Sequence, residues 1–144
     1  MRLLVFFLVF VGLAHAGHVS VSNCGFTSRA TLVHLDVERC DSVPCIIKRG
    51  IYTRFEFEFI PHVNSRTLTL DARFSLFGIN FPIPGVVSNL CKFVSCPIVA
   101  ERTYRIALTF YISMWSPPLV TRLTYRIRGD DRELGCYTTV VELH

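Results

Sequence analysis

The stretch "RFEFEF" occupies residues 54–59 and alternates three charged residues with three phenylalanines. In an extended strand, successive side chains point to opposite faces of the sheet, so the three rings share one face and the three charges share the other. Strict alternation over this length is typical of a strand with one buried face. The segment therefore predicts a strand whose apolar side faces the protein interior.

The same period of two recurs along most of the chain. Apolar and polar residues alternate in segments 33–38, 53–59, 68–76, 104–112 and 122–128, and a Thr- and Val-rich run follows at 137–143. Prolines and glycines lie between these runs, and "RGDD" at 128–131 predicts a tight hairpin turn. Six or seven strands with short turns predict a single all-β domain, an antiparallel β-sandwich.

The first sixteen residues have the pattern of a secretory signal peptide. Arg2 precedes an apolar run over residues 3–13, and residues 14–16 read A-H-A, which matches an A-x-A cleavage site. The apolar run is too short to span a bilayer. We therefore expect a domain of residues 17–144 that is secreted and extracellular, or lumenal in the endosomal or lysosomal pathway.

The composition of residues 17–144 argues against nucleic-acid binding and catalysis. Fourteen basic residues remain beside eleven acidic ones once Arg2 is excluded, and only Lys48 and Lys92 are lysines. Nucleic-acid binding usually shows Lys and Arg clustered on one element. The histidines are isolated and no serine lies in a G-x-S-x-G elbow. We therefore expect no enzyme, no cofactor, no metal site and no nucleic-acid partner.

The six cysteines all lie beyond the expected signal peptide, and an even count in a secreted protein predicts three disulfides. Six cysteines allow fifteen connectivities. The simplest pairing joins two close pairs and the two end cysteines: Cys40 with Cys45, Cys91 with Cys96, and Cys24 with Cys136. Four nearby thiols could instead bind zinc, but zinc pairs usually occur near histidine or further cysteines. Secretion favours disulfides.

The aromatic inner faces leave two interpretations open. The two inner faces of a sandwich meet about 10 Å apart, and here both faces would carry large rings. Such side chains can fill the gap as an ordinary core, or they can hold the sheets apart around a cavity for an apolar molecule. The alternation by itself favours the ordinary core.

Several motifs resemble the ML (lipid-recognition) domain family. They are "NCGF" at 23–26, "ERCDSVPCIIKRG" at 38–50, "FPIPG" at 81–85, "CKFVSCPI" at 91–98, "TYRI" at 103–106, "LTYRI" at 123–127 and "GDDRELGCY" at 129–137. The resemblance spans residues 23–143. It implies an immunoglobulin-like sandwich of two splayed sheets with an apolar cavity between them, and it implies the same three disulfides.

The resemblance also implies which side chains contact a ligand. The inward-facing residues of several strands would line the cavity, Phe81 would lie near its mouth, and Tyr104 and Tyr125 could hold a polar head group. The expected ligand-binding residues are Phe55, Phe57, Phe59, Leu68, Leu70, Phe74, Phe81, Tyr104, Ile106, Leu108, Phe110, Leu123 and Tyr125. The three rings of residues 55–59 replace smaller residues of the sterol carriers. This bulk favours a flexible fatty acid or a small hydrophobic signal over cholesterol.

The function that the resemblance implies is a secreted, non-enzymatic lipid-binding or lipid-transfer protein. Its ligand would be a sterol, a fatty acid or a similar small apolar lipid, and we expect a monomer. The alternative is a secreted protein-interaction module of innate immunity with a filled core. Four arginines on outer strand faces favour a solvated surface, or a transient contact with anionic membranes; they are Arg105, Arg122, Arg126 and Arg128.

Overall fold

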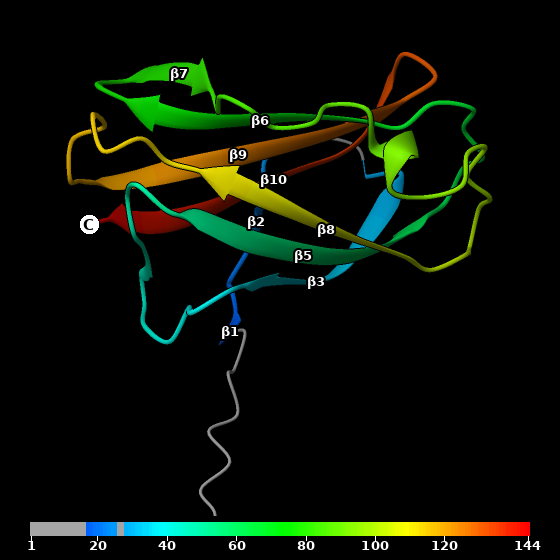
Figure 1. Cartoon of the computed structure of the whole chain (residues 1–144). Coiled ribbons are helices and arrows are strands. Elements are labelled where there is room, and N and C mark those ends of the chain that lie inside the picture. Colours follow the sequence, from blue (N-terminus) through cyan, green and yellow to red (C-terminus); the bar gives the residue numbers. More distant parts are fainter. Residues whose placement is uncertain (1–16, 26–27) are drawn as a thin grey trace, which may run out of the picture.

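Two β-sheets pack face to face in the computed structural model, which describes residues 17–25 and 28–144 (Figure 1). The predicted signal peptide, residues 1–16, lies outside the described residues. The elements are β1 (Gly17–His18), β2 (Ser22–Asn23), β3 (Ala30–Val37), β4 (Cys45–Ile47), β5 (Tyr52–Pro61), β6 (Thr69–Leu76), β7 (Ile79–Pro82), the 3₁₀ helix η1 (Leu90–Lys92), β8 (Tyr104–Tyr111), β9 (Val120–Gly129) and β10 (Arg132–Leu143).

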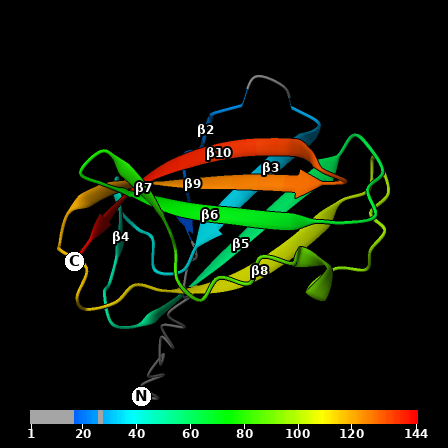
Figure 2. The ribbon, with the colours of Figure 1, turned by 90° about the horizontal axis from the view of Figure 1, so that it is seen from above.

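The strands form two sheets, which we call sheet A and sheet B. Sheet A has the order β1-β3-β5-β8, and sheet B has the order β2-β10-β9-β6-β7. The neighbours in each sheet run antiparallel, as predicted, but β4 pairs with β10 in parallel and places Cys45 opposite Val141. Figure 2 shows β2, β10 and the start of β3 at one long edge of the sandwich, and β8 at the other.

The stretch 54–59 forms the middle of β5, between β3 and β8. Phe55, Phe57 and Phe59 are buried, with exposed fractions of 2%, 7% and 0%. Their rings face sheet B and join one hydrophobic core that contains side chains of both sheets. On the opposite face of β5, Glu58 Oε2 lies 3.2 Å from Arg105 Nη2 on β8. The predicted division between an apolar and a charged face is confirmed.

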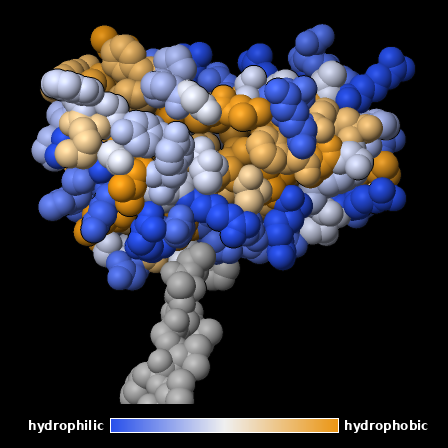
Figure 3. Space-filling model, viewed as in Figure 1, coloured by the Kyte–Doolittle hydropathy of each residue, from blue (hydrophilic) through white to orange (hydrophobic). Residues whose placement is uncertain are grey.

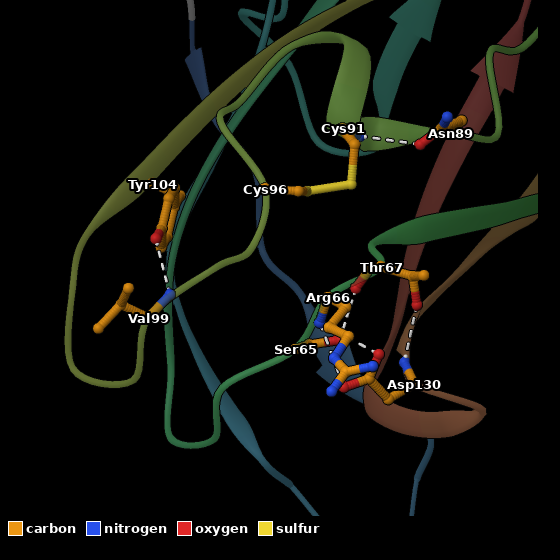
Figure 4. Close-up of a disulfide and its surroundings, with 9 residues drawn as sticks. All are labelled: Ser65, Arg66, Thr67, Asn89, Cys91, Cys96, Val99, Tyr104 and Asp130. Carbon is orange, nitrogen blue, oxygen red and sulfur yellow. Dashed lines mark hydrogen bonds between the residues drawn. A yellow bond between two sulfur atoms is a disulfide. The ribbon is translucent and has the colours of Figure 1, made fainter.

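The predicted hairpin turn at residues 128–131 connects β9 to β10. Asp130 and Asp131 have φ angles of 49° and 60°, so both adopt the left-handed conformation that a tight hairpin turn requires. The carboxylate of Asp130 accepts hydrogen bonds from the Arg66 N–H at 3.1 and 3.2 Å, and its own N–H donates to Thr67 Oγ1 at 2.8 Å (Figure 4). These bonds attach the turn to the segment before β6.

The sequence pattern assigns one residue of β3, Val33, to the wrong face of the sheet. The alternation over 33–38 puts Val33 inward, but Val33 is 49% exposed. The register of β3 against β5 shifts between Leu32 and His34. A shift of one residue moves a side chain to the other face of a sheet, so Leu32 points toward the interior in place of Val33.

Three disulfides hold the chain, and their pairing is the predicted one. Cys24–Cys136 joins the end of β2 to β10 within sheet B. The other two close short loops, each between cysteines five positions apart. Cys40–Cys45 joins the segment after β3 to the start of β4, and Cys91–Cys96 joins η1 to the loop that follows it (Figure 4).

Candidate functional site

An apolar cavity of about 30 Å³ lies between the two sheets. This volume is close to the share of liquid volume that one water molecule occupies. Sheet A contributes six side chains to the wall and sheet B contributes four. They are Leu32, Leu35, Phe55, Phe57, Leu108 and Phe110 from sheet A, and Leu70, Tyr125, Ile127 and Tyr137 from sheet B.

Six of the thirteen expected ligand-binding residues lie together around this cavity: Phe55, Phe57, Leu70, Leu108, Phe110 and Tyr125. Four others are buried in the core but do not form its wall: Phe59, Leu68, Ile106 and Leu123. Phe74 and Phe81 contact each other across β6 and β7, with ring centroids 5.8 Å apart. Phe81 is 39% exposed on the edge strand β7, so this ring pair lies outside the cavity wall.

Tyr104 does not offer its hydroxyl to the cavity. The hydroxyl accepts a hydrogen bond from the Val99 N–H at 2.8 Å (Figure 4). The Tyr104 ring lies 5.8 Å from the ring of Phe59. The bond connects β8 to the loop that follows Cys96. Tyr104 therefore has a structural role here, and a head group would need other partners.

Four wall residues were missed by the sequence analysis of the site: Leu32, Leu35, Ile127 and Tyr137. Leu35 and Ile127 belong to alternating runs, so their inward orientation was visible in the sequence. Leu32 reaches the interior only because of the register shift in β3. Tyr137 opens the last run, and its position depends on a second register shift, between Glu133 and Gly135 in β10.

The two tyrosines of the wall are neutral. Burial raises the pKa of Tyr125, and a hydrogen bond with Thr139, whose Oγ1 lies 3.2 Å from the phenol oxygen, partly offsets this rise. Burial also raises the pKa of Tyr137, offset in part by a hydrogen bond with Ser28. No ionised side chain belongs to the part of the wall that the described residues form. The cavity therefore suits hydrocarbon and disfavours an ion.

Two features are absent from residues 17–25 and 28–144. No group of three or more His, Cys, Asp or Glu side chains in these residues is arranged to hold a metal ion. No helix of the described chain has the length and apolar character needed to cross a bilayer.

Comparison with known proteins agrees with this architecture. Residues 18–143 match the profile of the ML domain. The chain belongs to the ML domain family. This ML domain is 31% identical over 96 residues to the mite group 2 allergen Der p 2 of Dermatophagoides pteronyssinus, an alignment that covers about two thirds of each chain (66% of both). It is 30% identical over 123 residues to Der f 2 of Dermatophagoides farinae, covering 84% of this chain and 82% of the allergen.

Two further relatives carry names from sterol biology. NPC intracellular cholesterol transporter 2 of Danio rerio is 24% identical over 141 residues, covering 96% of this ML domain and 94% of the transporter. The crystal structure of a Niemann-Pick type C2 protein from Japanese carpenter ant superposes with a TM-score of 0.76 at 18% identity, covering 87% and 99% of the two chains. At this identity, the superposition shows the fold alone.

Proposed function

We propose that this ML domain is a non-enzymatic lipid carrier that holds one small apolar ligand between its two sheets. The apolar cavity between the sheets, whose wall combines aliphatic and aromatic side chains of both sheets, carries the proposal. Membership of the ML domain family and the name of the Danio rerio relative, a cholesterol transporter, support it. Apart from the neutral phenols of Tyr125 and Tyr137, no titratable side chain of the described residues lines this space. The role that we propose is binding without chemistry.

Lipid binding requires the cavity to expand. Small-molecule pockets generally have volumes of about 300–1,000 Å³, whereas the free space here is about 30 Å³. The rings of Phe55 and Phe110 stack with centroids 4.5 Å apart. A lipid chain that entered the cavity would have to separate or rotate such pairs of rings. Burial of about 300 Å² of apolar ligand surface contributes about 7 kcal/mol of favourable transfer free energy to binding. The cost of rearranging the wall is subtracted from this contribution.

The small volume favours a second candidate function. If the sheets stay together, the rings are an ordinary core, and the protein is a secreted interaction module that recognises a protein partner through its surface. Close-packed cores leave few voids larger than a water molecule, and a free space of about 30 Å³ matches that description.

Native mass spectrometry of the secreted protein, before and after solvent extraction, separates the two functions. A carrier is expected to lose a discrete mass on extraction and then to take up a labelled fatty acid or sterol in a one-to-one complex. Absence of a bound mass together with absence of uptake would contradict the carrier proposal and leave the interaction module. The same spectra test two further expectations, a mature chain that begins at Gly17 and a monomer.

We also propose that a carrier of this kind contacts membranes through one end of the sandwich. Large apolar side chains are exposed there on the β6–β7 hairpin and on the β8–β9 loop: Phe77 (89%), Ile79 (59%), Met114 (60%) and Trp115 (96%). Figure 3 shows apolar side chains at the end of the molecule that carries the hairpin. Amphipathic aromatic residues are favoured at the membrane interface.

The arginines contribute less to such a contact than the sequence suggested. Arg105 lies 3.2 Å from Glu58 and Arg126 lies 2.6 Å from Glu133, so two of the four positive charges are already paired. Replacement of Phe77 and Trp115 by serine is therefore expected to slow lipid transfer between vesicles more than neutralisation of Arg105 and Arg126. An equal or opposite order would contradict the apolar contact.

A further inference from the structure

A second pocket adjoins the cavity at the long edge of the sandwich formed by β2, β3 and β10 (Figure 2). We call it the edge pocket. It has a volume of about 330 Å³ and opens to solvent; its wall consists of Val21, Asn23, Ser28, Ala30, Thr31, Leu32 and Tyr137. Leu32 and Tyr137 belong to the walls of both the edge pocket and the cavity. These two side chains therefore lie between the apolar interior and this polar surface.

Irregularities in two strands place Leu32 and Tyr137 at this boundary. The register shift in β3 turns Leu32 inward, and the register shift in β10 lies just before Tyr137. The ring of Tyr137 lies over the backbone of Gly135, where a Cβ would come within 2.6 Å of the Tyr137 hydroxyl. Register shifts of this kind often re-aim side chains near binding sites. Gly135 is thus required for the position of the Tyr137 ring.

The polar groups of the edge pocket are uncharged. They are the Asn23 amide, the Ser28 and Thr31 hydroxyls and the Tyr137 hydroxyl, which donates to the Ala30 carbonyl at 3.3 Å and lies beside Ser28. Two charged side chains close to this edge, Arg29 and Glu133, make contacts of their own. The Arg29 guanidinium donates to the Glu133 carbonyl at 3.3 Å, and the Glu133 carboxylate lies 2.6 Å from Arg126.

We propose that the edge pocket binds the polar head of the carried lipid, and that this head is an uncharged hydroxyl group, as in a long-chain alcohol. The inference rests on the proposed carrier function, because the chain of such a lipid would lie in the cavity beyond Leu32 and Tyr137. The head hydroxyl would donate to the Tyr137 phenol oxygen and accept from the Asn23 amide. The described wall of the edge pocket contains no cation to hold an ionised carboxylate, and burial of that ion costs far more than burial of a hydroxyl.

The opposite edge of the sandwich offers a different head-group site. A groove there shares Leu108 with the cavity and includes Arg54. A guanidinium would suit an acidic head, but Arg54 lies 3.1 Å from Glu56, which already compensates its charge. The Arg54 groove is therefore a weaker site for an acidic head group than its guanidinium alone would suggest.

The test compares 1-hexadecanol with hexadecanoic acid at pH 7, since the two share one chain length. Their Kd values are measured by displacement of a fluorescent hydrophobic probe from the wild-type protein and three variants. Tyr137→Phe removes one hydroxyl and keeps the ring, and Asn23→Ala alters an exposed residue of the edge pocket. Tyr104→Phe is the matched control, because its hydroxyl is bonded to Val99 and faces neither pocket.

The expected result is tighter binding of hexadecanol than of hexadecanoate by the wild-type protein. Tyr137→Phe and Asn23→Ala should each weaken hexadecanol binding about three- to tenfold, the effect of one hydrogen bond, and leave hexadecanoate binding unchanged. Tyr104→Phe should leave both affinities unchanged. Preference for the acid, or equal losses for both lipids in Tyr137→Phe, would overturn the edge-pocket proposal while lipid binding stands. If neither lipid displaces the probe, the carrier function itself fails.

Discussion

Phe57 and Phe59 provide a direct test of where the ligand lies. Both rings are buried on the same face of β5, with exposed fractions of 7% and 0%, but only Phe57 belongs to the cavity wall. Their centroids are 5.8 Å apart, so either replacement by alanine removes the same contact between the rings. Each variant is expected to lose about 3–5 kcal/mol of unfolding free energy.

A bound lipid should distinguish the two variants. Removal of the Phe57 ring adds roughly 100 Å³ to the cavity, and an unfilled cavity costs about 24 cal/mol per Å³. A lipid chain that fills the added space should therefore restore about 2 kcal/mol of the unfolding free energy that Phe57→Ala has lost. The space left in Phe59→Ala lies outside the cavity wall, so the lipid should restore almost none of the unfolding free energy that this variant has lost.

The assay is urea unfolding followed by far-ultraviolet circular dichroism, with and without saturating 1-hexadecanol. For each variant, the difference in unfolding free energy from the wild-type protein is compared with and without the lipid. Phe57→Leu and Phe59→Leu repeat the comparison at a smaller loss of stability, in case an alanine variant does not fold. If the lipid restored the stability of both variants equally, or of Phe59→Ala alone, the placement of the ligand against Phe57 would be refuted.

Three further predictions concern the frame around the cavity. The hydrogen bond from the Arg66 N–H lowers the pKa of Asp130 below its ordinary value of 3.8. The stability that this bond contributes is therefore present above pH 3.8 and is lost as the pH falls through the folded-state pKa. The stability deficit of Asp130→Asn at pH 7 should therefore shrink in acid unfolding curves. Replacement of both Cys24 and Cys136 by alanine opens a loop with a sequence separation of 112 and should cost about 4–5 kcal/mol in denaturant titrations. Tyr104→Phe should cost about 1 kcal/mol in the same titrations.

The long strands were predictable because their alternation is local. In β5, β6, β8 and β9, side chains two positions apart face the same side, and a buried face shows in the sequence as a row of apolar residues. The short strands β1, β2, β4 and β7 contain two to four residues. They are too short to show a period, and their pairing depends on contacts that are distant in the sequence.

The wall of the cavity could be predicted only in part. Alternation identifies the inward face of a strand, but it does not give the position along the strand where the two sheets separate. Phe57 and Phe59 illustrate this limit, since they share a face and only one lines the cavity. The register shifts that bring Leu32 and Tyr137 to the wall also leave no periodic pattern. Such shifts depend on how the neighbouring strands pair.

The position of the disulfides has a mechanical consequence for the sandwich. Immunoglobulin domains of antibodies have a disulfide between the centres of their two sheets. Here Cys24–Cys136 lies within sheet B, and Cys91–Cys96 closes a loop. Cys40–Cys45 connects the end of β3 to β4 at a corner where the chain itself passes between the sheets. None of the three disulfides joins the middles of the two sheets, so the middle of the sandwich can widen while every disulfide remains intact.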